Sequence, residues 1–186
     1  IYQRVFLSPA DHIQRQRTVM TQFENDTPRP SQLHVWLLAA RPKTLWAAVA
    51  PVLIGTAMAH CAGGVHVLSA VVCLMTALTL QIGTNFANDY FDFLKGADTP
   101  DRQGPLRVTQ AGLVRPQSVR NAFIVTFSFA ALGAVWLGLR AGPVLILIGV
   151  LAIASGIFYT AGPRPLGYMG LGDIFAFVFF GPVAVG

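Results

Sequence analysis

Charged side chains are scarce in this sequence, and their scarcity excludes an ordinary soluble domain. Asp, Glu, Lys and Arg make up 11% of the 186 residues, whereas about 25% is usual for a soluble protein. Hydrophobic residues reach 54%, and the mean hydropathy is +0.57. We therefore predict an all-α fold, a polytopic bundle of transmembrane helices.

Cysteine is also scarce in this sequence. Cys61 and Cys73 are the only two cysteines, too few for a disulfide framework or a cysteine zinc site, so we interpret them as packed or free thiols.

Residues 1–30 hold no apolar run long enough for a signal peptide or a span. We interpret them as a flexible polar tail and residues 31–186 as the membrane domain. Met20 stands where a natural start could lie, so residues 1–19 are left out of the predicted fold.

The basic residues do not indicate nucleic-acid binding, although the net charge is +5. They are spread along the chain and are not accompanied by an aromatic and basic surface that could read bases. We interpret them as signals of membrane topology and as contacts to anions.

Long apolar runs divide the chain into membrane spans. An uncharged run of 18 residues covers about 27 Å as a helix, enough for one span. The predicted spans are residues 45–62, 67–87, 122–139 and 143–161. A fifth run follows Asp173, but its 13 residues are fewer than the roughly 20 that cross a bilayer. We therefore expect the chain to end inside or just after a helix.

The distribution of Lys and Arg predicts the orientation of these spans. Residues 1–44, the 95–120 loop and the 162–172 loop lie on one side and hold twelve of the 13 basic residues. Arg140 is alone on the other side. By the positive-inside rule the N-terminus is cytoplasmic, and we expect a multi-pass membrane protein.

A stripe of polar side chains ends the second span. At about 100° per residue these side chains fall within one arc of roughly 100° on a helix. They are Gln81, Asn85, Asn88, Asp89 and Asp92. Ionisable groups are costly at membrane depth, so the stripe must face a cavity, a partner helix or a ligand.

Carboxylate and amide oxygens in such a stripe suit Mg²⁺, which takes few protein ligands and completes its shell with water and phosphate oxygens. Carboxylates alone would repel a diphosphate, so a bridging metal is needed. Basic residues can then hold the outer oxygens and stabilise charge as a leaving group departs. The candidates in and after the stripe are Lys95, Arg102 and Arg107. The sequence thus predicts a metal–diphosphate site with its mouth toward the cytosol.

Four segments in order resemble the UbiA superfamily of intramembrane aromatic prenyltransferases. They are RPKTLWAAVAPVLIGT, NFANDYFDFLKGAD, GPLRVTQAG and YTAGPRPLGYMGLGDIFAFVFFGPVAV. The resemblance runs from about Arg41 to Gly186. The Gly-Ala-Asp form of the second segment favours the branch that prenylates 1,4-dihydroxy-2-naphthoate in menaquinone biosynthesis.

The resemblance implies roles for particular residues. It implies metal binding by Asn88, Asp92 and a later acid, with Asp89 also in the signature. The usual position of the later acid, four residues after Asp92, is Gly96 here, so Asp98 takes its place. Asn88 and Asp92, with Lys95 and Arg107, are the predicted catalytic residues. Contacts to diphosphate or the aromatic substrate are expected from Asn85, Arg102, Tyr159 and Arg164.

The implied reaction transfers a polyprenyl group from an allylic polyprenyl diphosphate to the naphthoate, with loss of CO₂. The resemblance also implies about nine helices and a second acidic motif, which this chain does not reach. We therefore expect the 186 residues alone to bind diphosphate weakly and to lack full activity.

Two kinds of alternative remain open from the sequence. The acceptor could be 4-hydroxybenzoate, homogentisate or a haem or chlorophyll precursor. From another class, a transporter could line its conduction path with the stripe. Transporters more often show related halves and helices broken at mid-membrane, whereas this stripe lies at a helix end beside a basic loop. A non-catalytic scaffold has no need of the stripe.

Overall fold

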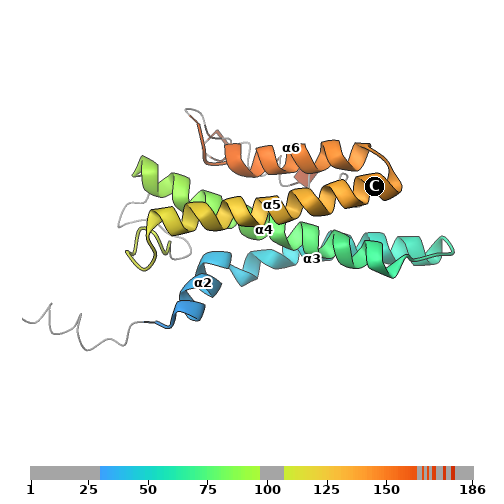
Figure 1. Ribbon diagram of the computed structural model, residues 1–186, viewed down its shortest axis with the longest axis horizontal. Helices are drawn as coiled ribbons and strands as arrows, with labels where there is room; N and C mark the ends of the chain where they lie inside the picture. Colours follow the sequence, from blue (N-terminus) through green and yellow to red (C-terminus); the bar gives the residue numbers. More distant parts are fainter. Residues whose placement is uncertain are drawn as a thin grey trace, which may run out of the picture. The chain divides into compact units, whose positions relative to one another are not determined.

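The computed structural model describes residues 30–96 and 107–162, with Pro165, Gly167, Met169, Gly170, Ile174, Phe177 and Val178. The chain divides into two units, Ile1–Gln32 and Leu33–Gly186, and the helices below belong to the second, apart from the first residue of α2. Every regular element in these residues is a helix, as Figure 1 shows. The predicted all-α class is confirmed.

The first two helices are joined by one residue. α2 (Gln32–Ala40) and α3 (Pro42–Cys61) flank Arg41, whose backbone is left-handed with φ 52°. The residue before a proline is disfavoured in the right-handed helical region, which ends α2 there. Pro42 then starts α3 with a suitable fixed φ and no N–H to leave unbonded. The Thr44 hydroxyl donates to the Arg41 carbonyl at 2.9 Å and fixes this break.

The longest helix is α4 (Val67–Lys95), which packs against α3, α5 and α6. It begins where the His66 ring accepts the Ser69 N–H at 3.2 Å. It ends at Gly96, which adopts φ 58° and bonds back to the Phe93 carbonyl at 3.1 Å. Its 29 residues measure about 43 Å, more than the ~30 Å of a hydrocarbon layer. About two turns of α4 therefore extend beyond the length that a membrane span needs.

α5 (Pro116–Ala141) runs alongside both α4 and α6 (Val144–Phe158) (Figure 1). Glycines allow these helices to approach closely. A Cβ on Gly133 would lie 2.0 Å from the Thr76 hydroxyl oxygen, and one on Gly156 would lie 2.5 Å from that of Thr84. Small residues at helix contacts are typical of membrane bundles, where close packing contributes much of the association.

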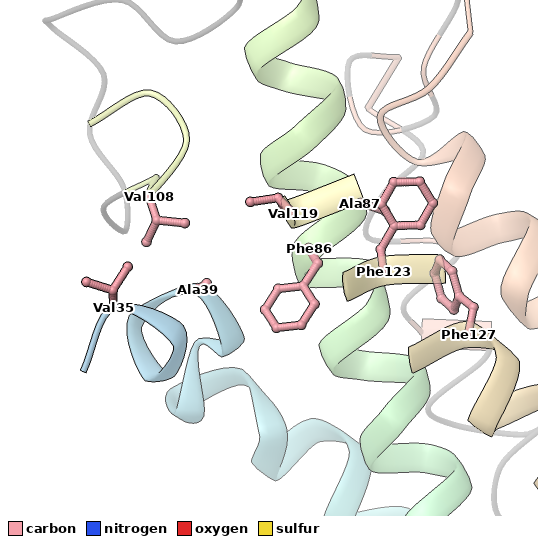
Figure 2. Packing of buried hydrophobic residues seen from close by; sticks show 8 residues of the cluster. All are labelled: Val35, Ala39, Phe86, Ala87, Val108, Val119, Phe123 and Phe127. Atoms are coloured by element: carbon pink, nitrogen blue, oxygen red, sulfur yellow. The ribbon is translucent and has the colours of Figure 1, made fainter. Parts of the chain in front are cut away.

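A hydrophobic cluster lies where α2, α4, α5 and the 107–114 turn meet, and Figure 2 shows its side chains. Its buried members are Val35, Ala39, Phe86, Ala87, Val108, Val119, Phe123 and Phe127. Trp36 packs edge-on against Phe86 with ring centroids 5.6 Å apart. The cluster fixes the C-terminal half of α4 between the surrounding elements.

Three helices are long and apolar enough to cross a membrane, namely α3, α4 and α5. They match the first three predicted spans, and the chain is a membrane protein. The fourth predicted span corresponds to α6, which has only 15 residues. The predicted fifth run lies outside the described residues, apart from Ile174, Phe177 and Val178.

Two features were not predicted. The first predicted span began at residue 45, whereas the structure has α2 and the start of α3 before that residue. In addition, α4 continues to Lys95, past the predicted span that ended at about Ala87 and past Asp92, the last residue of the predicted stripe. The apolar run ends at about Ala87, but the helix continues because its polar side chains find partners on other elements.

Candidate functional site: the polar half of α4

The predicted polar stripe is buried on the C-terminal half of α4. Asn85, Asn88, Asp89 and Asp92 expose 3%, 8%, 1% and 2% of their surface. Burying such groups costs several kcal/mol unless each is hydrogen-bonded or paired, on the order of 2–7 kcal/mol for a neutral polar group. The partners come from three segments of the chain, the α2–α3 junction, the 107–114 turn and the end of α6.

Gln81 and Asn85, at the N-terminal end of the stripe, bind the junction between α2 and α3. The Asn85 amide nitrogen donates to the Ala40 carbonyl at 2.8 Å and to the Thr44 hydroxyl at 2.9 Å. The Gln81 amide also donates to Thr44, at 3.3 Å. Asn85 is therefore a structural contact for this junction, and its predicted contact with substrate stays a prediction.

Asp89 binds the backbone of the 107–114 turn. One carboxylate oxygen accepts the Val108 N–H at 3.1 Å, and the other accepts the Thr109 N–H at 3.3 Å. Both contacts are buried. The carboxylate thus provides two adjacent amides of a turn with acceptors that they need away from water.

Asp92 forms an ion pair with Arg107. Only 2% of Asp92 and 8% of Arg107 is exposed. The pair places a guanidinium, which recognises carboxylates and phosphates well, directly beside the carboxylate predicted to hold a metal. The two predicted catalytic residues, 15 positions apart in sequence, are therefore neighbours.

Asn88 and Lys95 both bind the end of α6. The Thr160 hydroxyl donates to the Asn88 side-chain oxygen at 3.0 Å. The Lys95 ammonium donates to the Thr160 carbonyl, and to the Gly162 carbonyl at 2.8 Å. Lys95 itself is exposed and lies at the rim of the site. The carbonyls that it binds are neutral, and a diphosphate oxygen would be a stronger acceptor.

Some predicted site residues cannot be placed. Asp98, Arg102 and Arg164 lie outside the described residues. Tyr159 precedes Thr160 at the end of α6, and its carbonyl accepts the Gly167 N–H at 3.0 Å. A Cβ on Gly167 would come within 2.9 Å of the Tyr159 ring. The ring thus lies against this glycine, and its contact with substrate stays a prediction.

The chemistry of these residues fits a metal that arrives with a diphosphate. Within residues 30–96 and 107–162 no cluster of three or more His, Cys, Asp or Glu could form a metal cage by itself. Asn88 and Asp92 are one turn apart and supply an amide oxygen and a carboxylate. Mg²⁺ commonly takes one or two carboxylates and fills the rest of its shell with water and substrate phosphates. Asp89 suits this task less well, since both of its oxygens accept amide hydrogens.

The profile of the UbiA prenyltransferase family matches residues 48–186, which is well over half of the chain. The chain belongs to the UbiA prenyltransferase family. The resemblance predicted from the four segments is confirmed, and UbiA prenyltransferases generally use a divalent metal.

Two bacterial relatives carry names that state an acceptor, and the name of a third relative states the family alone. The 1,4-dihydroxy-2-naphthoate octaprenyltransferase of Escherichia coli (strain K12) is 44% identical over 161 residues, which cover 83% of this chain and 52% of that protein. The enzyme of the same name from Mycobacterium tuberculosis (strain ATCC 25618 / H37Rv) is 43% identical over 150 residues, 81% of this chain and 51% of that protein. UbiA prenyltransferase domain-containing protein 1 of Danio rerio is 33% identical over 159 residues, 83% of this chain and 46% of that protein.

The chain thus spans about half the length of the curated relatives that it matches. No solved structure matches the chain at a significant level.

The sequence did not predict several partners of the polar stripe. They are Thr44, Thr160 and the backbone amides of Val108 and Thr109. Backbone donors leave no mark in a sequence. A threonine at the end of the apolar α6 run was a signal, because a polar side chain there needs a partner.

Proposed function

We propose that this chain is the diphosphate-binding part of a membrane prenyltransferase that acts on 1,4-dihydroxy-2-naphthoate. The donor is an allylic polyprenyl diphosphate, and the immediate product is the quinol form of demethylmenaquinone, released with CO₂ and diphosphate, so that the enzyme serves menaquinone biosynthesis. The observation that carries the proposal is the convergence of Asn88, Asp92, Lys95 and Arg107 at one end of α4. The names of the bacterial relatives support this choice of acceptor.

Some residues of this chain would bind the metal, and others would bind the diphosphate directly. Asn88 and Asp92 hold Mg²⁺ through their oxygens, with Asp98 as a further predicted ligand. When bound, the metal neutralises diphosphate charge and improves it as a leaving group. Arg107 and Lys95 bind outer diphosphate oxygens, and they stabilise the charge that grows as the allylic C–O bond breaks.

The acceptor ring completes the reaction. Its electron-rich carbon forms a bond to the allylic carbon, and its carboxylate leaves as CO₂. The apolar helices exclude water that would otherwise quench the cationic allyl group. Arg102, Arg164 and Tyr159 remain the proposed contacts for diphosphate or the aromatic acid.

We place the site on the cytoplasmic side of a bacterial plasma membrane. Twelve of the 13 Lys and Arg residues fall on the side of the N-terminal tail and the 95–120 loop. Soluble aromatic acids and Mg²⁺ are available there, while the polyprenyl tail stays in the bilayer.

Prenyl transfer by the full-length protein in detergent tests the proposal. The protein is supplied with Mg²⁺, a polyprenyl diphosphate and either 1,4-dihydroxy-2-naphthoate or 4-hydroxybenzoate. We expect a prenylated, decarboxylated product from the naphthoate only, and no product when the metal is chelated. Product from 4-hydroxybenzoate alone would refute the choice of acceptor.

A further inference from the structure

Two acids on one face of α4 hold three consecutive residues of another segment. Asp92 pairs with the Arg107 side chain, while Asp89, three residues earlier, accepts the backbone N–H groups of Val108 and Thr109. Asp89 exposes 1% of its surface and Asp92 exposes 2%. The side chain of one residue and the backbone of the next two are thus fixed to the same helix.

The segment held in this way is a self-bonded turn. Within residues 107–114 the Arg107 carbonyl accepts the Ala111 N–H at 2.9 Å, and the Val108 carbonyl accepts the Leu113 N–H at 2.9 Å. Val108 is fully buried and lies in the same hydrophobic cluster as Val35 of α2 (Figure 2). Because the turn is bonded internally, fixing its first backbone groups also fixes where the Arg107 side chain starts.

We infer that Asp89 is a positioning residue whose carboxylate holds this turn so that Arg107 lies beside Asp92. The inference rests on the proposed function, in which Arg107 binds the diphosphate. An arginine on a segment that is already ordered loses less conformational freedom when it binds an anion, so its contact is stronger. Asp89 thereby acts on the diphosphate through Arg107 and does not touch it.

The chemistry of the side chain supports this role over that of a metal ligand. A carboxylate has two oxygens that only accept, which matches two amide donors, whereas Asn has one acceptor and an NH₂ group that would oppose the second donor. Asn88 and Asp92 lie about 40° apart around α4, and Asp89 lies about 60° beyond Asp92. Asp89 is therefore directed at the turn and away from the Asn88 side of the stripe.

A double-mutant cycle on the full-length protein tests the inference. The dissociation constant for inorganic diphosphate is measured in Mg²⁺ for the wild type, Asp89→Asn, Arg107→Ala and the double variant. We expect D89N to weaken binding about 10-fold and R107A at least as much, with the double variant close to R107A alone, because contacts that act through one group are not additive. Fully additive losses, or no loss in D89N, would overturn the inference.

Two controls keep this outcome clear. Arg140→Ala removes a cation beside Trp136 near the other end of α5, and its effect should be small and additive with that of D89N. In D89N, trypsin should also cleave after Arg107 faster than in the wild type, and equal rates would count against a positioning role. If D89N fails to fold, Asp89→Glu replaces it in the cycle, since Glu keeps the charge but shifts both acceptors by one CH₂ group relative to the Val108 and Thr109 amides, and a smaller loss with the same non-additivity is expected.

The cycle is separable from the proposed function because it uses inorganic diphosphate and no aromatic acceptor. If the wild type makes the naphthoate product but the losses of diphosphate affinity are additive, only the proposed role of Asp89 is refuted. If the wild type binds no diphosphate in Mg²⁺, the proposed function falls and the inference with it.

Discussion

The Thr160 hydroxyl donates a hydrogen bond to the Asn88 side-chain oxygen at 3.0 Å. This bond joins the end of α6 to the middle of the polar stripe, and Thr160 is 2% exposed. A hydroxyl that donates to the amide oxygen also fixes which way the amide points. Asn88 is thereby oriented before any metal binds.

Thr160→Val should therefore reduce turnover without unfolding the protein. Valine keeps the shape of threonine and leaves the main-chain carbonyl that Lys95 binds. The lost hydrogen bond is worth about 1 kcal/mol, so we expect kcat/KM to fall roughly 5- to 10-fold. Thr160→Ser, which keeps the hydroxyl, should stay within about twofold of the wild type. Equal rates in both variants would contradict an orienting role for this bond.

Asn85→Ala should destabilise the protein more than it weakens diphosphate binding. The change removes the donor to the Ala40 carbonyl and the Thr44 hydroxyl, at a cost of about 1–3 kcal/mol where these groups stay buried. Thermal unfolding in detergent should show a lower Tm. A large rise in the diphosphate dissociation constant at an unchanged Tm would instead support the predicted substrate contact.

Gly133→Ala should loosen the contact between α4 and α5. The added Cβ would lie 2.0 Å from the Thr76 hydroxyl oxygen, and such overpacking typically costs about 1–3 kcal/mol. Thr76→Ala in the same chain removes the obstacle and should restore most of the lost Tm. Gly55→Ala is the matched control, because a Cβ there meets nothing within 4 Å among the described residues. An equal loss in both alanine variants would contradict the packing argument.

Cys61 reports the proposed orientation. It is exposed at the end of α3, the end opposite to the α2–α3 junction. In spheroplasts a membrane-impermeant maleimide should label the wild type but not Cys61→Ser. Labelling that appears only after the membrane is opened would place the stripe on the outer side.

The sequence was sufficient for the parts of the fold that depend on side-chain pattern. Uncharged runs located α3, α4 and α5, and helical periodicity placed Asn85, Asn88 and Asp92 on one buried face. It was not sufficient for α2, because nine residues between a polar segment and a proline carry little periodic signal. The partner of Asp89 could not be predicted either, since backbone amides of any residues could serve. The pairing of Asp92 with Arg107 depends on how the 107–114 turn folds back onto α4, and that is a tertiary contact.

The proposed prenyl transfer depends on the carboxylate of Asp92 near the C-terminal end of α4. The most direct test is prenyl transfer by full-length Asp92→Ala in Mg²⁺, measured together with membrane insertion and Tm. We expect turnover to fall at least 100-fold in a protein that inserts normally, because the variant lacks both a metal ligand and the partner of Arg107. Near wild-type turnover in that variant would contradict the assignment of the stripe as the diphosphate site.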